Sequence, residues 1–171
     1  MCDSENDGRV YLPNSKTCFV CGEENFAGLK LRFFVEEEAV KAVFHPEPHH
    51  CGYANVVHGG IVAALLDETM GWAANRAMAR MTLTGELTVR YLKPVPGDRD
   101  SIVSAEIAKP GKRMVQVTAT IGDGADTIYA RAEGRFLPLS AEETRLIDGH
   151  LVYRGGEERV FASLYEEQRP T

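Results

Sequence analysis

The sequence lacks a long apolar segment, and its charge is predominantly negative. No stretch reaches the roughly 20 apolar residues that a membrane-spanning helix requires. The first ten residues, MCDSENDGRV, are acidic and polar, whereas a secretory signal begins with basic residues and continues with apolar ones. We therefore expect a cytoplasmic protein with no membrane partner. The net charge of -6 argues against a nucleic-acid partner, because phosphate recognition requires a basic surface.

Cysteine is also scarce, and the pattern of a zinc-binding domain is incomplete. The four cysteines are Cys2, Cys18, Cys21 and Cys51. Without an export signal, they are expected to be reduced thiols and not disulfides. Cys18 and Cys21 have the spacing of a zinc-binding pair, to which Cys51 or His49-His50 would add donors, but a second pair with this spacing is missing. The sequence therefore predicts neither a metal ion nor another cofactor.

The remaining composition fits one globular domain with tails. A length of 171 residues matches a single core, and hydrophobic and charged fractions of 44% and 26% are ordinary for a globular protein. Residues 1–17 have no periodic apolar pattern and predict a flexible lead-in. The domain is expected over residues 18–139. Residues 140–171 are charged and predict a C-terminal extension with short helices.

One long helix and six strands are predicted within the domain. Apolar residues at three- and four-residue steps predict a helix over residues 60–79 that is apolar on nearly every side. Alternating patterns predict strands over residues 29–35, 39–45, 83–95, 101–108, 114–122 and 127–137. Because no second helix of comparable length follows, the sheet must cover the first. The predicted fold class is α+β, with a helix on one face of an antiparallel sheet.

The strongest chemical signal is His58-Gly59-Gly60 at the start of this helix, with Asp67 further along it. Helix N-terminal N–H groups have no intrahelical partners and lie at the positive end of the helix dipole, so they stabilise an oxygen that gains negative charge. An ionised carboxylate on an apolar helix costs free energy unless it has a partner or a role. Asp67 as general base or nucleophile, the Gly59 amide as polariser of a carbonyl, and His58 as an orienting group together predict acyl transfer to water.

Each of these features also has a structural interpretation that stays open at this stage. The His58-Gly59-Gly60 run could be an ordinary turn into a helix, with His58 as its cap. Asp67 and Glu68 could form the solvated face of the helix. The scarcity of other polar residues along the helix favours the chemical interpretation of Asp67.

The run HGGIVAALLDETMG, followed by TGELTVRYLKPVPGD, resembles the hot-dog superfamily and, within it, the PaaI-type acyl-CoA thioesterases. The resemblance covers about residues 18–137, and CFVCGEENFAGLKLRF resembles the lead-in of some of these enzymes. It implies a hot-dog fold, in which a five- or six-stranded antiparallel sheet wraps one long central helix. It also implies a homodimer or a dimer of dimers, joined edge to edge, with active sites between subunits. The implied reaction is hydrolysis of an acyl-CoA thioester to free acid and CoA.

The resemblance also implies roles for individual residues. Asp67 becomes the acid that attacks the thioester or activates water, and the Gly59 amide polarises the carbonyl. Thr84 stands where relatives carry a hydroxyl residue contributed by the other subunit. Gly52 stands where many relatives have Gln or Asn near the carbonyl, and Asn55 is a candidate replacement.

An acyl-CoA substrate also brings phosphates, which require local positive charge. The candidate substrate-binding residues are Gly60, Asn55, Glu68, Arg90, Lys93, Lys112 and Arg113. The main alternative is a hot-dog module that binds acyl-CoA without hydrolysing it, which would not need Asp67. A hydratase or dehydratase of the same fold would need an Asp and His pair placed differently around the helix start.

Overall fold

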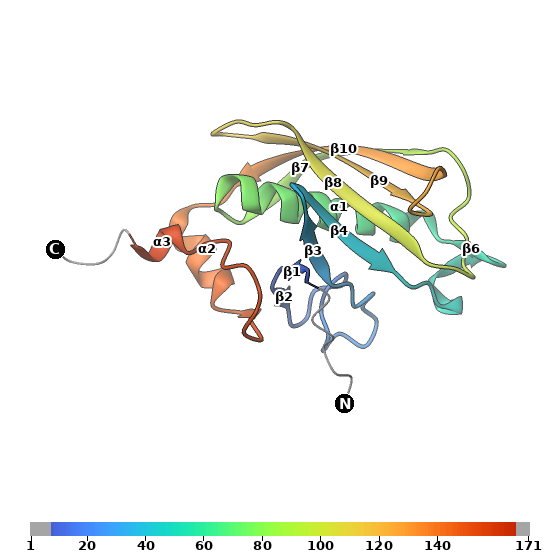
Figure 1. Ribbon diagram of the computed structural model, residues 1–171, viewed down its shortest axis with the longest axis horizontal. Helices are drawn as coiled ribbons and strands as arrows, with labels where there is room; N and C mark the ends of the chain where they lie inside the picture. The colour runs from blue at the N-terminus through green and yellow to red at the C-terminus, as the bar shows by residue number, and fades with distance from the viewer. Residues whose placement is uncertain (1–7, 167–171) are drawn as a thin grey trace.

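In the computed structural model, which describes residues 8–166, an antiparallel sheet wraps one long helix (Figure 1). The helix is α1, Gly59–Met78. The sheet has seven strands in the order β1-β3-β4-β8-β9-β10-β7. Their bounds are Val10–Tyr11 (β1), Phe33–Glu36 (β3), Ala39–Phe44 (β4), Thr82–Tyr91 (β7), Ser101–Lys109 (β8), Val115–Gly122 (β9) and Ile128–Pro138 (β10). The predicted α+β class and central helix are therefore confirmed.

Smaller elements flank this sheet. Two short antiparallel pairs join β2 (Asn14–Ser15) to β11 (Leu151–Val152) and β5 (Cys51–Tyr53) to β6 (Val56–Val57). A single 3-10 turn covers Pro48–His50, and two short helices, α2 (Ala141–Asp148) and α3 (Ser163–Glu166), follow the last long strand. Within residues 8–166, no helix has both the length and the hydropathy needed to cross a membrane.

The core lies between α1 and the concave face of the sheet. Leu65, Leu66 and Met70 on α1 have no exposed surface and form one cluster with inward-facing strand residues. These strand residues alternate along the chain, as at Val103, Ala105, Val115, Val117, Ala119 and Ile121. Each fully buried Leu or Val side chain contributes about 1.5–3 kcal/mol to stability. This burial on several sides explains why α1 carries so few polar residues.

Residues 10–15 differ from the flexible lead-in that the sequence predicts. Val10 pairs with Val35 and Tyr11 with Phe34, so β1 adds a seventh strand to the sheet. Leu12 is only 1% exposed and belongs to the core. The prediction of five or six strands was therefore wrong, because this three-residue apolar run is too short to show a periodic pattern. Residues 1–7 of the predicted lead-in lie outside the described residues.

Two predicted strands are shorter than expected, for reasons of hydrogen bonding. Residues 29–32 form a loop, in which the Leu29 and Leu31 N–H groups donate to the carbonyls of Phe19 and Val20. The strand predicted over residues 83–95 ends at Tyr91. Beyond that point, the next two N–H groups both donate to the carbonyl of Tyr129, and Pro94 has no N–H group to continue a ladder.

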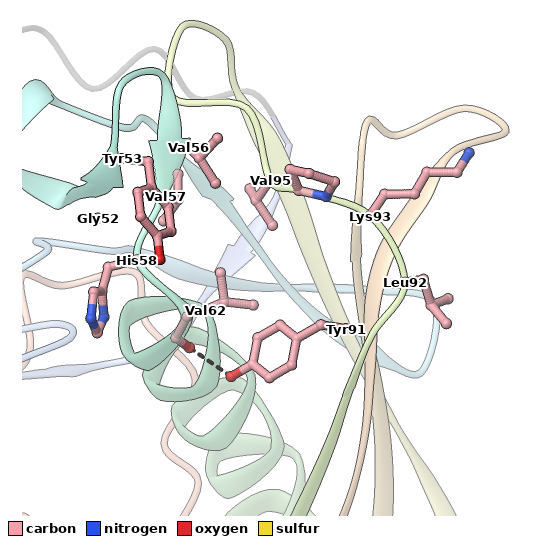
Figure 2. Close-up of a pocket in the computed structure, with 12 residues that line it drawn as sticks. Gly52, Tyr53, Val56, Val57, His58, Val62, Tyr91, Leu92, Lys93 and Val95 are labelled. Atoms are coloured by element: carbon pink, nitrogen blue, oxygen red, sulfur yellow. Dashed lines mark hydrogen bonds between the residues drawn. The ribbon is translucent and has the colours of Figure 1, made fainter.

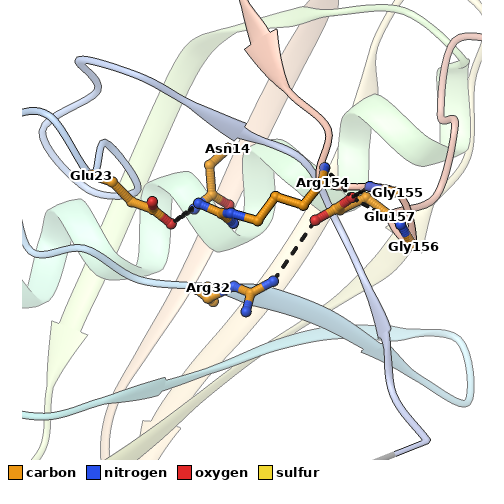
Figure 3. A network of polar contacts seen from close by, with 7 residues as sticks. All are labelled: Asn14, Glu23, Arg32, Arg154, Gly155, Gly156 and Glu157. Atoms are coloured by element: carbon orange, nitrogen blue, oxygen red, sulfur yellow. Dashed lines mark hydrogen bonds and ion pairs between the residues drawn. The ribbon is translucent and has the colours of Figure 1, made fainter. Parts of the chain in front are cut away.

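The C-terminal extension is attached to the domain by a polar network (Figure 3). Glu157 accepts hydrogen bonds from three consecutive backbone N–H groups, those of Arg154, Gly155 and Gly156. The Arg154 guanidinium pairs with Glu23 near the N-terminus. The extension therefore contacts residues that precede the first long strands, in addition to forming the short helices that the sequence predicts.

Candidate active site

His58 caps the N-terminus of α1. Its backbone is extended, with φ -61° and ψ 134°, and its Nδ1 accepts a 3.0 Å hydrogen bond from the Gly60 N–H. The His58 carbonyl accepts the N–H groups of Ile61 and Val62. Side-chain caps of this kind satisfy N–H groups that the helix leaves without partners. His58 therefore caps the helix, and its side chain occupies the Gly60 N–H group.

The Gly59 N–H is left without a hydrogen-bond partner among the described residues. It is the first residue of α1, where the helix dipole is positive. The Gly59 carbonyl accepts a 2.7 Å hydrogen bond from the Tyr91 hydroxyl at the end of β7, which fixes this first turn against the strand (Figure 2). A donor that is both free and held in place suits the stabilisation of a developing oxyanion.

The Gly59 amide lies beside a cavity of about 790 Å³. Its lining is mostly apolar and includes Val56, Val57, Val62, Leu92 and Val95. Tyr53, which is 81% exposed, lies at its rim, and Lys93 supplies its one cationic side chain. Figure 2 shows this lysine extending away from the helix start. A largely apolar cavity with a few polar groups is the usual form of a small-molecule site.

Asp67 lies two turns along α1, in a second cavity of about 250 Å³. The Thr84 hydroxyl on β7 donates a 2.9 Å hydrogen bond to Oδ1 of Asp67. Burial raises the pKa of Asp67 above its usual value, and the Thr84 hydrogen bond opposes part of this rise. The carboxylate is therefore half-buried and oriented by a hydroxyl group of its own chain. The resemblance implies a hydroxyl from the other subunit at this position, and that implication stays a prediction.

Glu68 faces the thiols of Cys18 and Cys21. Its Oε1 lies 3.4 Å from Sγ of Cys18 and 3.5 Å from Sγ of Cys21, in the same cavity as Asp67. Burial raises the pKa of Glu68 to about 8. The hydrogen bond that the two thiols share lowers the pKa of Cys18 to about 5, while this bond and burial raise the pKa of Cys21. Glu68 is thus a partner of the thiols and not part of a solvated helix face.

The two polar centres are separated along the helix. Gly59 and Asp67 are eight residues apart, which corresponds to about 12 Å of helix axis at 1.5 Å per residue. A carbonyl group is only about 1.2 Å long. One thioester therefore cannot contact both the Gly59 amide and the Asp67 carboxylate of a single chain at hydrogen-bond distance.

The other predicted substrate-binding residues do not gather at the larger cavity. Asn55 occupies the turn between β5 and β6 with φ 61° and lines a hollow with Gly52 and Gly97, but it does not line the larger cavity. Arg90, Lys112 and Arg113 are exposed and line neither cavity. Of the four basic candidates, the structure brings only Lys93 to the larger cavity.

Sequence reasoning missed Tyr91 and Tyr53. Tyr91 belongs to the quoted run TGELTVRYLKPVPGD, but its contact with Gly59 depends on how β7 crosses α1. Tyr53 lies in a segment that is rich in turn residues and shows no periodicity. The HGG turn and the run at the end of β7 are the sequence signals nearest to the cavity.

A long helix wrapped by an antiparallel sheet is the arrangement of the hot-dog fold. The thioesterase superfamily model matches residues 54–130, a range that includes Gly59 and Asp67. Over these residues the chain is similar to the thioesterase superfamily, and its fold is the hot-dog fold.

Individual proteins show the same likeness. The acyl-coenzyme A thioesterase THEM4 of Mus musculus is 29% identical over 108 residues, covering 63% of this chain and 46% of that protein. The chain thus corresponds to less than half of this relative. The crystal structure of the BH2602 protein from Bacillus halodurans with CoA is 31% identical, with a TM-score of 0.53 and coverage of 59% of this chain and 66% of that one. The E. coli PaaI protein, 16% identical with a TM-score of 0.60, covers 66% of this chain and 81% of its own and supports the fold alone.

Proposed function

We propose that the protein hydrolyses an acyl-CoA thioester to a free acid and CoA, with each active site formed by two copies of the chain. The observation that carries the proposal is the pairing of Asp67 with Thr84 at one end of β7 and of Gly59 with Tyr91 at the other. The free Gly59 amide polarises the thioester carbonyl and stabilises the oxyanion. Asp67 attacks the carbonyl carbon or takes a proton from the attacking water.

The exposed edge of the sheet supports the proposal that a second copy of the chain completes each active site. β7 is the last strand of the seven-stranded sheet, ten residues long, and largely exposed. Leu83, Tyr91 and Leu92 are 59%, 52% and 46% exposed. A long edge with unpaired backbone groups and apolar side chains favours pairing with another strand.

Two-fold pairing of β7 with itself brings the two centres together. In an antiparallel pair related by a two-fold axis, the end of each strand lies beside the start of its partner. The Tyr91 end of one β7, which carries Gly59, therefore approaches the Thr84 end of the other, which carries Asp67. This arrangement removes the 12 Å separation within one chain.

The substrate class has support from relatives and from the cavity. One relative is named an acyl-coenzyme A thioesterase, and one solved relative contains CoA. The cavity at Gly59 is apolar enough to hold an acyl or pantetheine segment, and Lys93 at its wall is the first candidate for a CoA phosphate.

Release of free thiol from a panel of acyl-CoAs tests this function. Wild-type protein is expected to turn over at least one of them, and Asp67→Asn, which keeps the size of the side chain, is expected to lower kcat by about 10²–10⁴-fold. Tight binding without turnover would favour the non-catalytic acyl-CoA-binding module. Full activity of Asp67→Asn would exclude the proposed role of Asp67.

A further inference from the structure

Three potential metal ligands converge beside Asp67, and neither the proposed hydrolysis nor the comparisons assign them a role. The Sγ atoms of Cys18 and Cys21 and a carboxylate oxygen of Glu68 all lie within 4.8 Å of one another. The two sulfur-to-oxygen distances are 3.4 and 3.5 Å. With Zn–S bonds of about 2.3 Å and Zn–O bonds of about 2.0–2.2 Å, a tetrahedral ion holds its sulfur and oxygen ligands about 3.5 Å apart.

The backbone around the two thiols already supports negatively charged sulfur. The Val20 N–H donates to Sγ of Cys18 at 3.3 Å, and the Ser15 N–H donates to Sγ of Cys21 at 3.4 Å. Such outer hydrogen bonds orient metal ligands and tune their basicity. Gly22 closes the turn by donating its N–H to the Cys18 carbonyl, and a Cβ there would lie 2.3 Å from that oxygen.

Two rigid parts of the molecule hold the three donors, because one loop carries both cysteines and α1 carries Glu68. The loop carrying both cysteines is fixed by the N–H groups of Leu29 and Leu31, which donate to the Phe19 and Val20 carbonyls at 2.8 and 2.9 Å. Glu68 projects from the middle of α1, whose neighbouring residues are core. A site supported in this way requires little rearrangement on binding a ligand.

We propose that Cys18, Cys21 and Glu68 form a three-ligand site for a thiophilic divalent cation, best matched by Zn²⁺, with its fourth position open to the cavity that holds Asp67. Thiolates select soft ions such as Zn²⁺ over Mg²⁺ and Ca²⁺. Each thiol that binds as a thiolate releases its proton to solvent. The fourth position, which water occupies in three-ligand zinc sites, opens into the space lined by Asp67 and Thr84. Glu68 is the ligand that sequence spacing could not identify, while Cys51 and His49-His50 lie outside this cluster of the described residues.

Competition with a chromophoric zinc chelator tests the site in the reduced full-length protein. We expect one Zn²⁺ per chain, and we expect Cys21→Ser and Glu68→Gln each to weaken binding by at least about 10–100-fold, the range found when even an outer partner of a metal ligand is lost. The matched control is the Cys2→Ser/Cys51→Ser double variant, which keeps the site and should bind as wild type does. Equal binding by wild type and Glu68→Gln, or loss of binding in the control, would overturn the proposal.

Cobalt provides a second measurement that does not depend on a variant folding. Co²⁺ added to reduced wild-type protein should produce sulfur-to-metal charge-transfer absorption, and Zn²⁺ should then abolish it by displacement. Absence of this absorption would count decisively against thiolate ligands. Neither measurement uses thioester hydrolysis, so a failure of the metal site and a failure of the proposed reaction are distinguishable.

Discussion

The Thr84 hydroxyl on β7 donates a 2.9 Å hydrogen bond to Oδ1 of Asp67 on α1 of the same chain. This bond ties the edge strand of the sheet to the carboxylate of the central helix. It leaves the second carboxylate oxygen, Oδ2, available to a water or a substrate. In the proposed mechanism Thr84 is therefore a positioning residue, whose hydroxyl fixes the rotation of the Asp67 carboxylate.

Replacement of Thr84 by Val should lower kcat and leave KM nearly unchanged. A hydrogen bond to a charged group contributes about 1.5–3 kcal/mol, which corresponds to a loss of roughly 10–100-fold if it is fully used in the transition state. Thr84→Ser keeps the hydroxyl and should retain most of the activity. Steady-state kinetics on the best acyl-CoA separates the two variants, and a Val variant as active as the Ser variant would contradict the positioning role.

Gly59 permits a test that removes a backbone N–H without a side-chain deletion. Proline is favoured at the first helical position, and the extended backbone of His58 suits a residue that precedes proline. Gly59→Pro should therefore keep the helix and lose the donor, with kcat lowered by about 10²–10³-fold.

The control for this prediction is Gly59→Ala. Its Cβ would meet the Tyr91 ring at 3.6 Å, an ordinary contact, and its N–H remains. Near wild-type kcat is expected for Ala, with unchanged circular dichroism for both variants. If the Ala and Pro variants lose activity equally, shape and not the amide is what matters at this position.

The fold was predictable from sequence wherever burial imposes a regular pattern. α1 and the long strands between residues 101 and 138 are covered on one or more sides, so their apolar residues repeat at helical or strand spacing. β1 has two residues and joins the sheet through backbone hydrogen bonds, which leave no side-chain pattern. Residues 29–32 alternate like a strand, yet the N–H groups of Leu29 and Leu31 donate to the loop of residues 18–21.

The candidate site was predictable only where its residues are neighbours in sequence. The spacing of His58-Gly59-Gly60 and Asp67 is local and follows from one helix. By contrast, Glu68 is 47 residues from Cys21, and Tyr91 is 32 residues from Gly59. Such contacts depend on how elements pack, which periodicity does not encode.

Glu157 provides a prediction about stability and pH. Its side chain is 4% exposed, accepts three backbone N–H groups and lies 3.9 Å from the Arg32 guanidinium. Although burial acts to raise the pKa of Glu157, the N–H donors of residues 154–156 outweigh it and keep the pKa below its usual value. Glu157→Gln should lower the free energy of unfolding at pH 7 by about 1–3 kcal/mol, measured by urea denaturation.

The sign of the pH dependence follows from this lowered pKa. The stabilisation is present above the unfolded-state pKa of about 4.3 and is lost as the pH falls through the lower folded-state pKa. The difference between wild type and Glu157→Gln should therefore shrink on acidification below about pH 4. Glu106→Gln, at an exposed position of β8, is the control and should change stability by less than about 0.5 kcal/mol at any pH. A difference for Glu157→Gln that grows on acidification would contradict the assignment.

Mixed dimers test whether Gly59 and Asp67 act from different chains. A chain with Asp67→Asn and a chain with Gly59→Pro can be co-expressed with different affinity tags, and the mixed dimer isolated by sequential purification. If active sites are shared, one site of this dimer combines the intact Gly59 of the first chain with the intact Asp67 of the second. About half of wild-type activity should then return, although each homodimer is nearly inactive.

The complementary dimer pairs wild type with a chain that carries both substitutions. With shared sites, every site of this dimer receives one defective group, so activity should fall to the level of the single variants. With sites confined to one chain, the wild-type chain would keep its own site and about half of the activity would remain. The two mixed dimers thus give opposite results under the two arrangements, and because each contains the same two substitutions, a general effect on folding or dimer stability cannot produce the difference between them.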